Sequence, residues 1–66
     1  MTINDTKFDI ALANSGLSIS EAAARAGISR QRFCAILNQK RSTPQSVGKI
    51  AKALNVNVTE IIETEN

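Results

Sequence analysis

The sequence contains no histidine, tryptophan or tyrosine, and its only cysteine is Cys34. Without an imidazole, Cys34 has no partner that would activate it as a nucleophile, and the usual zinc-binding sets cannot be assembled. No glycine-rich phosphate loop is present either. We therefore predict that the protein is not an enzyme and that it has no catalytic residues, no metal site and no cofactor.

Long apolar runs are also missing. No stretch is long enough to span a bilayer, and the first residues lack the charge, apolar run and cleavage pattern of a secretory signal peptide. A single cysteine cannot form an intrachain disulfide, which is typical of a reducing compartment. We therefore expect a cytoplasmic protein that makes no membrane contact.

Acidic residues are absent from the middle of the chain. Residues 22–59 carry a charge of +7 and the remainder carries −5, which gives the net charge of +2. The seven basic residues are Arg25, Arg30, Arg32, Lys40, Arg41, Lys49 and Lys52. Such segregation is typical of a surface that binds an anionic partner. A merely solvated basic surface is the alternative, and charge alone does not decide between them.

The patterns that are present predict helices in a single small domain of 66 residues. We expect five of them, at residues 4–14, 19–26, 30–38, 44–54 and 58–63. Each is preceded by or begins at a residue type that caps helix N-termini, namely Asn4, Ser18, Ser29, Thr43 and Asn57. The stretches in which apolar and polar residues alternate are too short to predict a β-strand. The predicted fold class is all-α, a compact five-helix domain.

The segment RAGISRQRF, residues 25–33, predicts a helix-turn-helix. Gly27 supplies the positive φ that a sharp turn after a helix needs, and Ser29 starts the next helix. The second helix of such a pair lies in the DNA major groove, with its first residues on base edges. Arg30 and Gln31 occupy that first turn, where Arg matches guanine and Gln matches adenine.

Three stretches of the chain resemble the phage-repressor and Cro-type (XRE-like) helix-turn-helix family: GLSISEAAARAGIS, RQRFCAILNQKRSTPQSV and KIAKALNVNVTEII. The resemblance covers residues 8–62 and implies five helices, DNA binding by the third and a homodimer. By position, it implies base contacts by Arg30, Gln31, Cys34 and Ala35. It implies phosphate contacts by Ser18, Ser29, Asn38, Lys40 and Arg41, and by Arg32, whose position suits a base contact as well.

Two positions depart from the family pattern. Ile19 stands where the family often has a glutamine that holds a phosphate. Asn38-Gln39 stands where the family often has Asn-Gly, and glutamine at positive φ is strained. We therefore expect the turn after the third helix to differ from the family's, which leaves the placement of Lys40 and Arg41 less determined.

The last predicted helix suggests how the protein assembles. Ile61 and Ile62 lie about 100° apart on a helix, so one can enter the core while the other is spare and is assigned to a homodimer contact. The favoured function is a sequence-specific regulator of transcription, a repressor, that binds a near-palindromic double-stranded DNA operator. The alternative is an antitoxin-like or other protein-interaction module on the same fold. No small-molecule ligand is evident.

Overall fold

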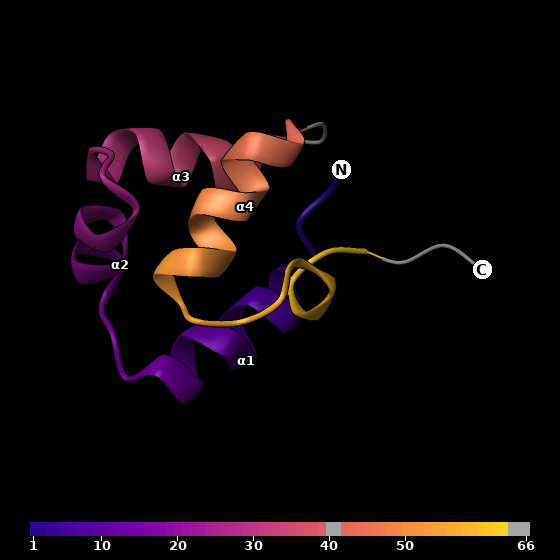
Figure 1. Cartoon of the computed structure of the whole chain (residues 1–66), viewed down its shortest axis with the longest axis horizontal. Coiled ribbons are helices and arrows are strands. Elements are labelled where there is room, and N and C mark those ends of the chain that lie inside the picture. Colours follow the sequence, from indigo (N-terminus) through magenta and orange to yellow (C-terminus); the bar gives the residue numbers. More distant parts are fainter. Residues whose placement is uncertain (40–41, 64–66) are drawn as a thin grey trace.

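The computed structural model describes residues 1–39 and 42–63. These residues form α1 (Asp5–Ser15), α2 (Ile19–Ala26), α3 (Arg30–Asn38) and α4 (Pro44–Ala53), followed by a short 3-10 helix, η1 (Val58–Glu60). In Figure 1, α4 crosses the middle of the molecule and α1, α2 and α3 surround it. Helix α2 packs against α3 and α4, while η1 packs against α1 and α4. Over the described residues the all-α prediction is confirmed, with four α-helices rather than five.

The helices begin at the caps that the sequence predicts. The side chains of Asn4, Ser18, Ser29 and Thr43 each accept a hydrogen bond from the backbone N–H three residues later, over 2.9–3.1 Å. These bonds satisfy N–H groups that have no acceptor within the helix. Pro44 follows as the first residue of α4, where its missing N–H costs nothing. Local side-chain chemistry therefore fixes all four starts.

The ends of the helices depend on single backbone conformations. Gly27 lies at φ 75°, the left-handed conformation expected of it, and Asn55 lies in the same region at φ 58°. Gln39, after α3, lies instead at φ −77° and ψ 133°, which is extended backbone. The turn after α3 therefore avoids the strain that positive φ would impose on glutamine, and it differs from an Asn-Gly turn as expected.

The core lies between α1, α2, α3 and α4. Phe33 is completely buried on α3, and its ring centroid lies 6.0 Å from that of Phe8 on α1 in a tilted arrangement. The other buried apolar residues are Ile3, Ala11, Ala22, Ala23, Ile36, Val47, Ile50, Ala51, Ala53, Leu54 and Ile61. Alanines on α2 allow α4 to approach closely, so a chain with two phenylalanines can still close a packed interior.

The prediction of a fifth α-helix over residues 58–63 is wrong. Glu60 does accept a hydrogen bond from the backbone N–H of Asn57, over 2.8 Å, but only the short 3-10 helix η1 forms. Ile61 then turns to φ −125°, and Ile62 forms an isolated antiparallel bridge with Ile3. The N-terminal segment takes backbone groups that a continuing helix would need, and this pairing ends the helix early.

No helix among residues 1–39 and 42–63 is long and apolar enough to cross a membrane.

Replacing Gly48 with alanine should stabilise the protein. Gly48 lies inside α4, its φ is not positive, and an added Cβ would meet no atom within 4 Å. Because glycine weakens a helix interior, we expect Gly48→Ala to raise the free energy of unfolding by about 0.5–1 kcal/mol in urea denaturation. Gly27→Ala is the contrasting control and should lower it by about 1–2 kcal/mol, since alanine is strained at positive φ. A less stable Gly48→Ala protein would contradict the prediction.

Candidate nucleic-acid interface

One face of α3 points away from the core. Gln31, Ala35 and Asn38 are exposed on it and Cys34 is half-buried beside them, while Phe33 is buried on the opposite face. This separation follows from helical spacing, because residues three, four and seven apart share a face. The structure thus brings together three of the four predicted base-contacting residues and one predicted phosphate-contacting residue.

Arg30 and Arg32 flank this face on its two sides. Each lies about 100° around the helix from Gln31, and both are exposed. In the described part of the chain, neither guanidinium has a hydrogen bond or an ion pair. Helix α3 has no acidic residue in its first turn, and Ser29 caps it by accepting from the backbone N–H of Arg32 over 3.1 Å. The start of α3 therefore offers unneutralised positive charge and free donors to a ligand.

The start of α2 is less favourable for a phosphate than that of α3. Ser18 is exposed there, as a phosphate contact would require. Glu21, however, accepts a hydrogen bond from the backbone N–H of Ser18 over 3.0 Å, and this bond lowers the pKa of the Glu21 carboxyl below its usual 4.5. Ile19 packs against the core instead of pointing toward a ligand. A charged carboxylate therefore lies where the resemblance implies a phosphate.

Beyond the end of α3, Lys40 and Arg41 lie outside the described residues. The next residue, Ser42, was not anticipated from the sequence as a contributor to the site. It is the one buried polar residue in the described part of the chain, 4% exposed. Its hydroxyl donates to the backbone carbonyl of Ile36, in the last turn of α3, over 3.2 Å. The sequence contains no signal for this role, because serine in a turn is ordinary and its burial depends on distant residues.

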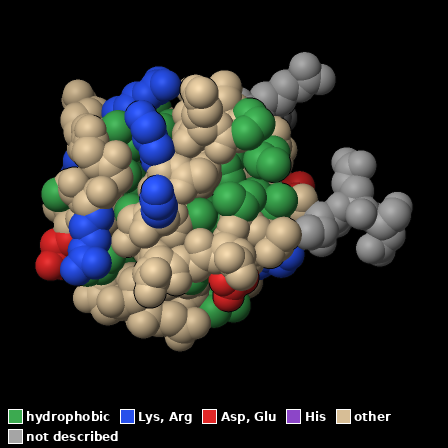
Figure 2. Space-filling model, viewed as in Figure 1, with side chains coloured by type: hydrophobic (Ala, Val, Ile, Leu, Met, Phe, Trp, Pro, Cys, Tyr) green, Lys and Arg blue, Asp and Glu red, His purple; other side chains and the backbone are tan. Residues whose placement is uncertain are grey.

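Positive side chains gather on one part of the surface. In Figure 2, most of the Lys and Arg side chains on the face shown lie on its upper and left part, where Figure 1 places α2, α3 and α4, and acidic side chains lie beside them at the left edge. Arg25, Lys49 and Lys52 are all exposed, like the two arginines of α3. The acid-free segment of the sequence is therefore an exposed basic region of the folded molecule.

The two isoleucines assigned to a homodimer contact have different environments. Ile61 is completely buried, so it offers no surface to a second copy. Ile62 is half-buried, and its backbone carbonyl accepts a hydrogen bond from Nζ of Lys7 over 3.1 Å. A dimer contact at this pair would therefore fall to Ile62.

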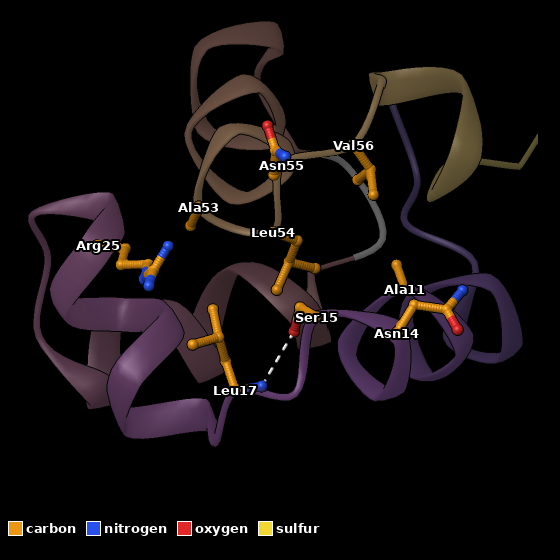
Figure 3. A pocket seen from close by; sticks show the side chains of 9 residues that line it. All are labelled: Ala11, Asn14, Ser15, Leu17, Arg25, Ala53, Leu54, Asn55 and Val56. Carbon is orange, nitrogen blue, oxygen red and sulfur yellow. Dashed lines mark hydrogen bonds between the residues drawn. The ribbon is translucent and has the colours of Figure 1, made fainter.

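A cavity of about 350 Å³ lies among the C-terminal ends of α1, α2 and α4. Figure 3 shows Arg25 at one side of the cavity, which Leu17 and Leu54 also line. The amide groups of Asn14 and Asn55 point away from Arg25 in this view. The labelled polar side chains at this cavity therefore point in different directions.

Comparison with known families bears on the interpretation of this surface. The family model described as the Cro/C1-type HTH DNA-binding domain matches residues 7–66. The chain belongs to this family. No curated protein and no solved structure matches the chain. Within the Cro/C1-type fold of this protein, α2, the turn at Gly27 and α3 form the helix-turn-helix, and residues 1–6 lie outside the family match.

Membership in the Cro/C1-type family indicates a DNA-binding regulator and double-stranded DNA as the partner. In the helix-turn-helix, the second helix enters the major groove while the first crosses the backbone. Helix α3 occupies the second position in this protein, and its outer face carries polar and small side chains. The exposed surface of α3 is therefore the candidate reading surface.

Proposed function

We propose that the protein is a sequence-specific transcriptional regulator, a repressor, that reads the DNA major groove with α3. The observation that carries this proposal is the first turn of α3. Arg30 and Gln31 are exposed there, have no hydrogen-bond partner in the described part of the chain, and face no acidic residue in their own turn. These are the two side chains that pair with guanine and adenine through two hydrogen bonds each.

The roles of the remaining residues follow from their positions on the surface. Cys34 and Ala35 are small, so they let the backbone of α3 approach the base edges closely. Ser29, Arg32 and Asn38 lie around this face and are assigned to phosphate contacts, with Lys40 and Arg41. Ser18 is the weakest of these assignments, because Glu21 would repel a phosphate at the same helix end.

We further propose that two copies bind one operator. A homodimer would place two α3 helices in successive major grooves on the same side of the DNA. Ile62 is the residue we assign to the contact between copies, since it is only half-buried and Ile61 is enclosed in the core. The operator would then be a near-palindrome.

A protein-interaction module, such as an antitoxin, is the second candidate. The observation in its favour is the exposure of two large apolar side chains, Ile10 at 57% and Met1 at 51%. Single exposed apolar side chains are common on soluble proteins, so they are weak support for a protein-binding surface. A helix without acidic residues, such as α3, is what DNA binding requires, and a protein-interaction module does not need one. DNA binding is therefore the stronger proposal.

Selection of bound DNA from a random-sequence pool tests the proposal directly. We expect an enriched motif with two inverted half-sites about 10 bp apart centre to centre, because this is the spacing of successive major grooves. Binding to a selected duplex should weaken as salt rises, since phosphate contacts release counterions. A pool carried through without protein is the control. A single asymmetric half-site would contradict the dimer, and a pool with no enriched motif would favour the protein-interaction candidate.

A further inference from the structure

The first four residues contact two parts of the chain that are distant in sequence, Ser42 and residues 61–63. Ile3 is buried in the core and forms the bridge with Ile62, and the backbone N–H of Asn4 donates to the carbonyl of Ile61 over 2.8 Å. The backbone N–H of Glu63 donates to the carbonyl of Thr2 over 2.9 Å. We name residues 1–4 the N-terminal clasp. The clasp is thus anchored on the C-terminal segment of the described chain.

The other end of the clasp holds Ser42. The backbone nitrogen of Met1 donates to the carbonyl of Ser42 over 3.0 Å, and the backbone N–H of Ser42 donates to the carbonyl of Met1 over 2.7 Å. This reciprocal pair fixes the backbone of Ser42 at a point where the chain enters α4. Residues 1–6 lie outside the family match, so the clasp precedes the part of the chain that the family model covers.

Ser42 in turn holds the end of α3. Its hydroxyl donates to the carbonyl of Ile36 over 3.2 Å, and the backbone N–H of Gln39 donates to the same oxygen over 3.3 Å. Carbonyls in the last turn of a helix lack a partner within the helix, so these donors determine where the helix ends. Asn38, assigned to a phosphate contact, belongs to this last turn.

We propose that Ser42, held by the N-terminal clasp, is a positioning residue for DNA recognition: it fixes the C-terminal turn of α3 against the groove. This inference rests on the proposed function. The turn at Gly27 holds one end of α3, and Ser42 holds the other. Without the Ser42 hydroxyl, α3 still forms, but its last turn frays and the contacts near Asn38 lose their fixed geometry.

The test compares Ser42→Ala with Ser15→Ala. Ser15 is a matched control, because its hydroxyl donates to the carbonyl of Leu12 in the last turn of α1, over 2.6 Å. It also accepts from the backbone N–H of Leu17 over 3.1 Å, so its loss is at least as disruptive to the fold. Ser42→Ala should lower the melting temperature by about 4–8 °C, the shift that losing one hydrogen bond brings in a domain of this size, and Ser15→Ala should lower it by at least as much.

Only Ser42→Ala should impair DNA binding. At a temperature well below both melting temperatures, we expect the affinity of the Ser42→Ala protein for a selected duplex to fall about 3- to 10-fold. The affinity of the Ser15→Ala protein should match that of the unsubstituted protein. Ser42→Cys, which keeps a weak donor of similar size, should fall between Ser42→Ala and the unsubstituted protein. Equal affinities of the Ser42→Ala and Ser15→Ala proteins would overturn the proposal. The Ser42→Cys measurement replaces that of Ser42→Ala if the alanine variant does not fold.

Amide hydrogen exchange separates this inference from the proposed function. The Gln39 amide should exchange several-fold faster in Ser42→Ala than in Ser15→Ala, because opening of the last turn of α3 exposes it. If the unsubstituted protein binds no selected DNA, the proposed function fails, while Gln39 exchange still reports whether Ser42 holds α3. If Gln39 exchanges equally in both variants, Ser42 does not hold α3 and the inference is overturned.

Discussion

Replacing Phe33 with alanine is expected to unfold the protein or leave it marginally folded. Phe33 is completely buried on α3 and contacts the ring of Phe8 on α1. Removing a buried phenylalanine ring costs about 3–5 kcal/mol, from lost burial and from the cavity left behind. A domain of this size has only a few kcal/mol of stability in total, so little or none would remain.

Urea denaturation followed by circular dichroism measures this loss. The control is Cys34→Ala, the next residue of the same helix, which is half-buried on the outer face and should change the free energy of unfolding by well under 1 kcal/mol. A Phe33→Ala protein that unfolded cooperatively within 1 kcal/mol of the unsubstituted protein would show that the core does not depend on the aromatic pair.

Helix starts and helix faces could be predicted from the sequence because they depend on neighbouring residues. The Ser18 cap needs only the backbone N–H of Glu21, three residues away, and the structure contains that bond. The buried position of Phe33 and the exposed position of Gln31 follow from 3.6 residues per turn. The spacing of apolar and polar residues along α3 is therefore enough to predict which of its faces forms the candidate site.

The C-terminal region could not be predicted in the same way, because its conformation depends on residues far along the chain. The local sequence from Asn57 to Glu60 has the same capping chemistry whether an α-helix or a single 3-10 turn follows. The bridge between Ile62 and Ile3 decides the outcome, and the two residues are separated by almost the whole chain. The burial of Ser42 against Met1 has the same origin.

The start of α2 lies between these two cases, because only part of its structure could be predicted from the sequence. Ser18 and Glu21 have the spacing of a capping box, and the resemblance implies a phosphate at Ser18. The structure shows the consequence of combining them, since the Glu21 carboxylate bonds the backbone N–H of Ser18 and so places a negative charge at the helix end where a phosphate would bind. Each local prediction is reasonable, but the two compete for one position.

Replacing Gln31 with alanine should relax sequence preference without weakening general DNA binding. Gln31 is exposed in the first turn of α3, carries no charge and makes no hydrogen bond in the described part of the chain. Loss of a two-bond contact to adenine costs about 1–3 kcal/mol of discrimination at one base pair. Selection from a random pool should therefore lose its preference at one position in each half-site, while affinity for non-specific DNA stays nearly unchanged.

Arg30→Ala should alter both sequence preference and the response to salt. Arg30 carries a charge that has no partner in the described part of the chain, so its removal takes away a base contact and a source of attraction to phosphates. We expect one base-pair preference to weaken by about 1–3 kcal/mol and the slope of log affinity against log salt to become shallower. Both variants should remain folded, because neither side chain belongs to the core. If both selected the same DNA motif as the unsubstituted protein, α3 would not be the reading helix, and the protein-interaction candidate would become the better account of this surface.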